Sequence, residues 1–216
     1  MLQTGITLLR RSRGRVRVFY TPRGPIEKSV MSDVAEVLRT LYERGLVQAM
    51  GGNVSVLHNG LVYISPTRLF RGGLRWLDVA VMTMDGRVVR GRPSSEWRMH
   101  IAIYRRLKGV TAVVHAHPPA LLAADAAGLR LEASLLMEAQ ATVGCIASVP
   151  RVKPGTWELA DAVATALEAS GCRAAVLRNH GVVAVGGSVW EALNMAEAVE
   201  DLARISLGIG GRVVGG

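Results

Sequence analysis

Three of the chain's five histidines stand at the ends of apolar runs that predict buried strands. The run Ala112-Val-Val-His-Ala-His-Pro118 holds His115 and His117, and Ala174-Ala-Val-Leu-Arg-Asn-His-Gly181 ends in His180. Side chains alternate faces along a strand, so the first two histidines project to the same side, next to the proline that ends the strand. Neutral imidazoles are good metal ligands, so this pair supplies two ligands of a three-histidine site, with His180 as the candidate third. Either of the first two alone is better explained as a hydrogen-bonded core or surface residue.

A metal site used in catalysis also needs an acid–base group, and Glu96 is the candidate. It lies in Pro93-Ser94-Ser95-Glu96, which is expected to open a helix and to place the carboxylate in its first turn. From there Glu96 could reach a metal held at strand ends. An acidic residue in a first turn also has an ordinary structural explanation, because it interacts favourably with the helix dipole.

Two segments are candidates for holding an anionic substrate. Gly51-Gly52-Asn53 offers open backbone N–H groups and an amide, as phosphate-binding turns do. Ser94 and Ser95 open the predicted helix, where hydroxyls and free N–H groups together form an anion site. Each signal alone is weak, because glycine turns and serine caps are common. Beside a metal triad they indicate a phosphorylated substrate.

The elements that must position these residues alternate between hairpins and helices. Strands are expected after the Gly51-Gly52 turn and, in chain order, over 61–64, 76–84, 87–89, 112–117, 143–149, 174–180 and 182–185. Helices are expected from a cap at Ser29 or Ser32 to Gly45, from Pro93, over 119–127, from Thr156 to Ser170, and over 188–207. This pattern predicts an α/β domain with a mixed sheet.

Length and composition indicate one globular domain. The chain has 216 residues, of which 50% are hydrophobic and 20% charged. No apolar run reaches the length of a membrane span, and the N-terminus lacks the apolar region of a signal peptide. We therefore expect a cytoplasmic protein without a membrane partner.

The net charge of +9 is concentrated at the N-terminus. Residues 1–28 hold seven basic side chains and one acidic one, a net +6, which leaves +3 for the other 188 residues. We therefore divide the chain into a basic N-terminal extension, residues 1–28, and a domain, residues 29–216. The extension is predicted to be a surface element, with an anion-binding arm as the second interpretation. This uneven distribution argues against a nucleic-acid partner.

The two cysteines, Cys145 and Cys172, are too few and too far apart in sequence for a disulfide framework or a zinc knuckle. They are predicted to pack as free, small apolar side chains.

Five separated motifs together resemble the class II aldolase/adducin family. In chain order they are Gly52-Asn53-Val54-Ser55, Ser65-Pro66-Thr67, Pro93-Ser94-Ser95-Glu96 with His100 on the same helix, His115-Ala116-His117-Pro118 and Asn179-His180-Gly181. The resemblance spans about residues 32–207. It implies a single three-layer α/β/α domain with a mixed central sheet, and a homotetramer with active sites at the subunit interfaces.

The resemblance also implies roles for these residues. Zn²⁺ would be bound by His115, His117 and His180, with Glu96 completing the resting site and then acting as acid–base on the substrate carbon. The positions that match phosphate-binding residues are Gly52, Asn53, Ser65, Thr67, Ser94 and Ser95. The implied reaction cleaves a ketose 1-phosphate, such as L-fuculose 1-phosphate, to dihydroxyacetone phosphate and a small aldehyde such as lactaldehyde. The same ligand set would accept Mn²⁺, Co²⁺ or Fe²⁺.

The chain departs from the aldolase pattern in its tyrosines. That pattern brings one catalytic tyrosine from the neighbouring subunit and another from near the C-terminus, whereas this chain has none after Tyr104. Arg68 stands where the family often has a glycine. His100 is expected to support the site from behind or to pack in the core, and packing is the preferred interpretation.

Because the tyrosines are absent, two other reactions on the same metal site stay open: a pentulose-5-phosphate 4-epimerase and a methylthioribulose-1-phosphate dehydratase. A non-enzymatic, adducin-like interaction domain is the third alternative. That alternative predicts eroded metal ligands, but all three histidines and Glu96 are present.

Overall fold

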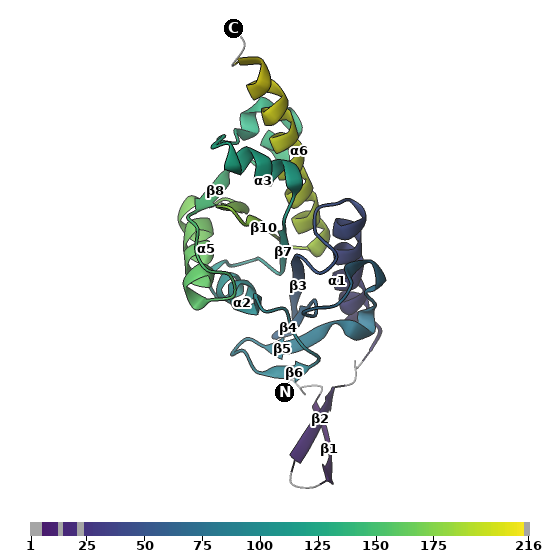
Figure 1. Cartoon of the computed structure of the whole chain (residues 1–216). Coiled ribbons are helices and arrows are strands. Elements are labelled where there is room, and N and C mark those ends of the chain that lie inside the picture. Colours follow the sequence, from purple (N-terminus) through teal and green to yellow (C-terminus); the bar gives the residue numbers. More distant parts are fainter. Residues whose placement is uncertain (1–5, 13–14, 21–23, 214–216) are drawn as a thin grey trace.

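The computed structural model describes residues 6–12, 15–20 and 24–213 (Figure 1). In this part of the chain an eight-stranded sheet has the order β6-β5-β4-β3-β7-β10-β9-β8, and β1 and β2 form a separate two-stranded ribbon. Neighbouring strands of the large sheet are antiparallel except β8 and β9, which are parallel. The predicted mixed sheet is therefore confirmed.

The strands are β1 Ile6–Ser12, β2 Arg15–Tyr20, β3 Asn53–His58, β4 Leu61–Ile64, β5 Ala80–Thr83, β6 Val88–Arg90, β7 Ala112–Ala116, β8 Ile146–Val149, β9 Ala174–Leu177 and β10 Gly181–Gly186. The α-helices are α1 Pro25–Glu43, α2 Trp97–Arg106, α3 Pro119–Ala126, α4 Met137–Thr142, α5 Trp157–Ser170 and α6 Val189–Val213. Short 3₁₀ turns lie at Arg71–Gly73, Trp76–Asp78 and Ala133–Leu135.

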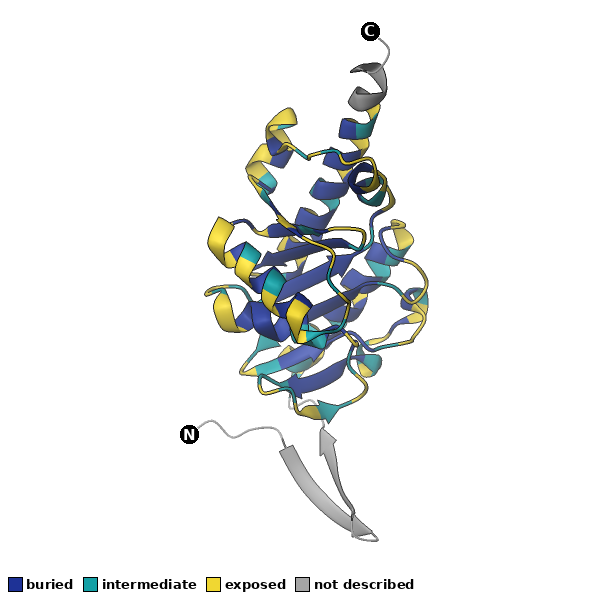
Figure 2. Cartoon of the chain, turned by 60° about the vertical axis from the view of Figure 1, so that its left-hand side comes forward, coloured by how far each residue is buried: buried dark blue, intermediate teal, exposed yellow. Residues whose placement is uncertain are grey.

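Helices cover both faces of the large sheet, which makes three layers. The helices α1, α3 and α6 pack on one face with strand residues such as Val114, and α2 and α5 pack on the other with residues such as Val113. Consecutive residues of β7 thus enter opposite cores, as the alternation of side chains along a strand requires. Figure 2 shows the buried sheet between helices whose outer sides are exposed. The predicted three-layer α/β/α class is confirmed.

The first helix begins earlier than predicted. Neither Ser29 nor Ser32 caps it: α1 starts at Pro25, behind Gly24 at the N-cap position. Proline suits the first helical position because its backbone angle φ is already helical and its missing N–H would have no helical partner. The helix therefore includes residues 25–28, which the sequence assigned to the extension. It ends as expected before Gly45, which has a φ of 70°.

Several other bounds differ from the prediction. The strand expected over 143–149 begins only at Ile146, because Val143 caps the unpredicted helix α4 and Gly144 follows it with a φ of 67°. The strand expected from Trp76 begins only at Ala80, since the Asp78 carboxylate accepts a hydrogen bond from the Arg75 N–H and closes a 3₁₀ turn. The helix expected to end near Leu207 continues to Val213.

The prediction of free cysteines is wrong, because Cys145 and Cys172 form a disulfide. Cys145 lies one residue before β8 and Cys172 two residues before β9, and these strands are parallel neighbours in which Ile146 pairs with Ala174. This register brings the two Cα atoms to 5.3 Å despite a sequence separation of 27. Spacing along the chain could not reveal the strand pairing.

Within the described ranges, no helix has the length and apolar character needed to cross a membrane.

Candidate metal centre

The sheet topology brings the three predicted histidines to one edge. Strand β10 is antiparallel to both β7 and β9, so β7 and β9 run in the same direction and end at the same edge. His115 lies within β7 and His117 directly follows it. His180 lies three residues after β9 ends, in the turn that leads into β10, and not at the end of the strand as predicted.

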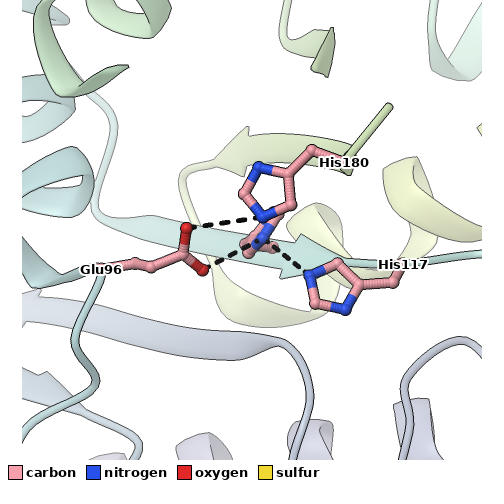
Figure 3. Close-up of side chains that lie close together, drawn as sticks. Glu96, His117 and His180 are labelled. Carbon is pink, nitrogen blue, oxygen red and sulfur yellow. Dashed lines mark hydrogen bonds and ion pairs between the residues drawn. The ribbon is translucent and has the colours of Figure 1, made fainter. Parts of the chain in front are cut away.

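Glu96 joins the three histidines to form a four-residue cluster. Figure 3 shows Glu96, His117 and His180 pointing towards one another. The Nε2 atoms of His115 and His117 are 3.0 Å apart, and Glu96 Oε2 is 3.2 Å from His115 Nε2. Glu96 Oε1 is 3.6 Å from His180 Nε2. One potential ligand atom from each of the four residues lies within 4.8 Å of the others.

These distances suit a metal ion. Metal–ligand bonds of about 2.0–2.1 Å in a tetrahedral arrangement separate neighbouring ligand atoms by about 3.3 Å, close to the spacings in this cluster. Three imidazoles and a carboxylate form a ligand set for a divalent transition metal. Glu96 Oε1 is buried and has no hydrogen-bond donor in the described structure, as expected of an oxygen that faces a cation.

Hydrogen bonds fix the rings of two of the histidines. His115 Nδ1 lies 2.9 Å from the carbonyl oxygen of Val182, and His117 Nδ1 lies 3.1 Å from Oε1 of Gln48. Both oxygens only accept, so each Nδ1 carries the hydrogen and each Nε2 presents its lone pair to the centre of the cluster. The two rings therefore have the tautomer that a metal requires.

The turn that carries His180 is held from α3. The buried Asp125 accepts a hydrogen bond from the N–H of Asn179 at 2.6 Å and pairs with Nη1 of Arg178 at 2.9 Å. Asn179 has a φ of 58°, which the extra bond helps to stabilise. A side chain at Gly181 would come within 2.2 Å of the Ala116 carbonyl oxygen, so glycine is required there. Sequence reasoning missed Asp125.

Glu96 stands one residue before α2 and not in its first turn as predicted. Its carboxylate does not cap the helix. Burial alone would raise the pKa of Glu96, but His115, His180 and a hydrogen bond from Asn53 outweigh it and lower that pKa well below its usual range. The carboxylate is therefore ionised and available to a cation.

Electrostatics favour neutral side chains at two of the histidines. Burial and the neighbouring His115 lower the pKa of His117 to about 3 and that of His180 to about 4. For His115, burial lowers the pKa, but the adjacent Glu96 outweighs burial and raises it. The carboxylate that attracts a proton to this ring would equally favour a metal cation.

Behind Glu96 runs a buried chain of hydrogen bonds. Glu96 Oε2 accepts from Nδ2 of Asn53 at 2.9 Å, and Asn53 Oδ1 contacts Nε2 of His100. His100 Nδ1 lies 2.6 Å from Oγ of Ser55, which in turn lies 2.6 Å from the hydroxyl of Tyr104. Asn53, Ser55 and His100 are at most 2% exposed. The preferred interpretation of His100 as packing alone is therefore wrong.

The ionised carboxylate sets the direction of every bond in this chain. Glu96 can only accept, so the Asn53 NH₂ faces it and the Asn53 oxygen faces His100. His100 must then donate from Nε2 and accept at Nδ1 from Ser55, which accepts from Tyr104. Burial lowers the pKa of His100 to about 3, so the ring is neutral, as this pattern requires.

The predicted phosphate-binding segments lie side by side. Pro66 and Pro93 form an antiparallel bridge, and the Ser94 N–H donates to the Ser65 carbonyl oxygen at 3.0 Å. Ser65 and Ser94 are buried, and their hydroxyls accept hydrogen bonds from the N–H groups of Val54 and Glu96. Thr67 is half-buried and Ser95 is exposed.

The glycine turn of the same site is held by a residue that sequence reasoning missed. Arg71 donates to the carbonyl oxygens of Met50, Gly51 and Gly52. Gly52 has a φ of 60°, and a Cβ there would lie 2.8 Å from the His115 carbonyl oxygen, so glycine is required. A buried arginine following Arg68-Leu-Phe leaves no recognisable pattern in a sequence.

The fold and the candidate metal cluster agree with a known class of protein. Residues 32–207 match the model of the Class II Aldolase and Adducin N-terminal domain. The chain belongs to this family. The family recognised from the five motifs is therefore confirmed.

Several relatives of this chain are named as aldolases. An L-fuculose phosphate aldolase of Methanococcus maripaludis is 34% identical over 176 residues, covering 82% of this chain and 94% of the relative. A 5-deoxy-D-ribulose 1-phosphate aldolase of Bacillus thuringiensis is 34% identical over 173 residues, covering 77% and 79%. The crystal structure of L-fuculose-1-phosphate aldolase from Thermus thermophilus superposes with a TM-score of 0.78 at 29% identity, covering 87% and 98%. The prediction of a lyase is confirmed.

Proposed function

We propose that this protein is a zinc-dependent aldolase that cleaves a ketose 1-phosphate, with L-fuculose 1-phosphate as the first candidate substrate. One observation carries the proposal: an ionised carboxylate, Glu96, lies within 3.6 Å of His115 and His180 and beside two segments suited to bind a phosphate. The printed activities of the relatives, aldolases of fuculose phosphate and of 5-deoxy-D-ribulose 1-phosphate, support the same substrate class.

In this proposal His115, His117 and His180 hold the metal, and Glu96 completes the resting site. When bound there, a divalent cation polarises the ketone oxygen and stabilises the negative charge that carbon–carbon cleavage leaves behind. Glu96 exchanges the proton at the carbon from which the aldehyde departs, and Asn53 holds the carboxylate in position for that step. The substrate phosphate binds between the glycine turn and the two serine segments. Asn53 differs from the other predicted phosphate residues in that its amide is already bonded to Glu96 and His100.

We further propose that the protein acts as a cytoplasmic homotetramer with its sites at subunit interfaces. The group that takes the proton from the hydroxyl that becomes the aldehyde carbonyl would then come from a neighbouring copy. The division into a basic extension and a catalytic domain stays a prediction, and the basic side chains before residue 24 lie outside what the structure describes.

The test combines a metal assay with a product assay. Bound metal is quantified in the purified protein, and release of dihydroxyacetone phosphate from L-fuculose 1-phosphate is then followed. Glu96→Gln is expected to lower the rate by about 100-fold or more, because the proton-transfer group is lost. His117→Ala is expected to lose the metal as well. His58→Ala is the matched control, since it removes a histidine from the far end of β3, and it should leave both readouts unchanged.

Bound zinc without cleavage of any ketose 1-phosphate would contradict the aldolase proposal and favour an epimerase or dehydratase. Absence of any bound or bindable divalent metal would contradict the metal centre itself.

A further inference from the structure

Arg71 is a buried cation whose hydrogen-bond partners are backbone carbonyls. Arg71 begins a short 3₁₀ turn, Arg71–Gly73, between strands β4 and β5, yet the residue is only 2% exposed. The guanidinium donates to the carbonyl oxygens of Met50, Gly51, Gly52 and Pro66 at distances of 2.8–3.0 Å. Its own N–H donates to the Ala49 carbonyl oxygen at 2.9 Å. The side chain and backbone of this one residue therefore hold the whole turn from 49 to 52.

No acidic side chain compensates this charge. No ion pair involves Arg71 anywhere in the part of the chain that the structure describes. Arginine stays protonated in proteins, and removing a full charge from water is costly unless an opposite charge or strong acceptors replace the water. Carbonyl oxygens supply only partial negative charge. The guanidinium charge of Arg71 is therefore without an ion-pair partner in the described structure, and an anion could neutralise it.

The arginine also determines where the peptide N–H groups point. In a trans peptide the C=O and N–H lie on opposite sides, and the described chain has no cis peptide. Arg71 Nε binds the Gly51 oxygen, so the N–H of Gly52, in the same peptide unit, points away from the guanidinium. No acceptor for this N–H is found among the described residues. A free N–H is suited to bind an anion when a cation binds the oxygen of the same peptide unit.

Arg71 connects both halves of the predicted phosphate site. Three of its carbonyl partners lie in the glycine turn, and the fourth, Pro66, lies between Ser65 and Thr67. Pro66 in turn bridges to Pro93, next to Ser94. The guanidinium thus connects segments that are distant in sequence and lie close to the metal centre, where a Cβ on Gly51 would be 3.2 Å from Nδ1 of His117.

We infer that Arg71 determines the protein's preference for phosphorylated substrates. Its guanidinium supplies positive charge to the anion site, and its bond to the Gly51 oxygen directs the Gly52 N–H into that site. The ligand class is a phosphate monoester dianion. Arg71 does not touch the reacting carbon, so it is a positioning and specificity residue. The inference deepens the proposed function and rests on it only in identifying the anion as the substrate's phosphate.

The experiment measures phosphate binding separately from catalysis. Inorganic phosphate is titrated into the metal-loaded protein by calorimetry, and KM and kcat are measured with L-fuculose 1-phosphate and with unphosphorylated L-fuculose. Arg71→Gln is expected to weaken phosphate binding by about tenfold or more, as removal of a charged partner of an anion does. It should raise KM for the phosphorylated ketose by a similar factor and leave kcat/KM for the unphosphorylated sugar within about twofold. Arg75→Gln is the matched control, because it removes the same charge from an exposed position in the same loop.

Arg71→Lys keeps the charge but cannot reach four carbonyls, so it should restore part of the phosphate affinity and provides a second variant if the glutamine variant does not fold. Metal content and melting temperature report on folding. Phosphate affinity of either variant within twofold of the wild type would overturn the inference, as would an equal loss of activity on both sugars. If the wild type binds phosphate in an Arg71-dependent way but cleaves no ketose phosphate, the inference stands and the proposed function fails.

Discussion

The two halves of the site are built in different ways. The metal half, Glu96 with His115, His117 and His180, consists of side chains, most of them held by a hydrogen bond to another group. The anion half, the turn 50–52 with Ser65–Thr67 and Ser94–Ser95, is shaped mainly by backbone, and Arg71 holds it by its carbonyl oxygens.

This difference matches what each half is proposed to bind. A metal ion needs ligand atoms at defined distances, which only side chains with locked rings and carboxylates provide. A phosphate needs several converging donors, which a glycine turn supplies through its own N–H groups. Substitutions in the metal half should therefore lower kcat and metal affinity, whereas substitutions in the anion half should raise KM for phosphorylated substrates.

The largest loss of kcat is expected from Asn53→Asp. A second carboxylate would replace the amide that donates to Glu96 at 2.9 Å, and two like charges at that distance cannot both stay ionised. We expect kcat to fall by about 100-fold, with KM changed much less. Steady-state kinetics at saturating zinc measures this split. Asn194→Asp, at an exposed position on α6, is the matched control. A rise in KM at unchanged kcat would instead assign Asn53 to the anion half.

A smaller loss of kcat is expected from His100→Phe, which removes the donor that orients the Asn53 amide. We expect kcat to fall by about tenfold, as is usual when the partner of a metal-site group is lost. Tyr104→Phe removes only the outermost hydroxyl of the same chain and should cost less. Equal effects of the two variants would mean that the chain is needed for packing and not for orientation.

Burial of His100 also predicts that the stability of the protein depends on pH. The pKa of His100 is lowered to about 3 in the folded protein, below its ordinary value of 6.5. Between these values the unfolded chain binds one more proton than the folded chain, so the free energy of unfolding falls as the pH drops below 6.5 and is insensitive to this group above it. One such group contributes a slope of up to about 1.4 kcal/mol per pH unit. Urea unfolding of metal-free protein from pH 4 to 7 should show a shallower slope for His100→Phe than for Tyr104→Phe.

The smallest effect on the site is expected from the disulfide. Cys145 and Cys172 join the outermost strand β8 to its neighbour β9. In the strand order, β7 and β10 separate this pair from β3 and the glycine turn that precedes it. Closing a loop of this length stabilises a protein by about 3.5 kcal/mol in the chain-entropy model. Cys145→Ser with Cys172→Ser should lower the melting temperature measurably while metal content, kcat and KM stay within about twofold. Loss of bound metal would show that this edge is coupled to the His180 turn.

Some features of the fold and of the site follow from local sequence patterns. The alternation along a strand predicted that His115 and His117 point the same way, and the sequence His58-Asn59-Gly60 predicted the hairpin of β3 and β4. Thr156 and Gly171 predicted the two ends of α5, where the hydroxyl accepts from the Leu159 N–H and the glycine has a φ of 68°. These features are governed by a few neighbouring residues.

Other parts depend on contacts between distant segments. Whether His100 on α2 packs or hydrogen-bonds depends on Asn53 and Ser55, which reach it from strand β3. Whether the cysteines are free depends on the pairing of β8 with β9. Neither question has a local signal, because the decisive partner lies tens of residues away.

The sequence by itself predicted the candidate metal ligands and a mixed α/β sheet. The periodicity of two along a strand, which the backbone imposes locally, put His115 and His117 on one face, and the motifs shared with the family indicated Glu96, His180 and the three-layer architecture. Only the tertiary structure decided which groups hold those ligands and where the buried charge of Arg71 lies. The physical reason is that a buried polar group must find its partner across space. The register of strands and the packing of helices set that distance, and the spacing of residues along the chain does not.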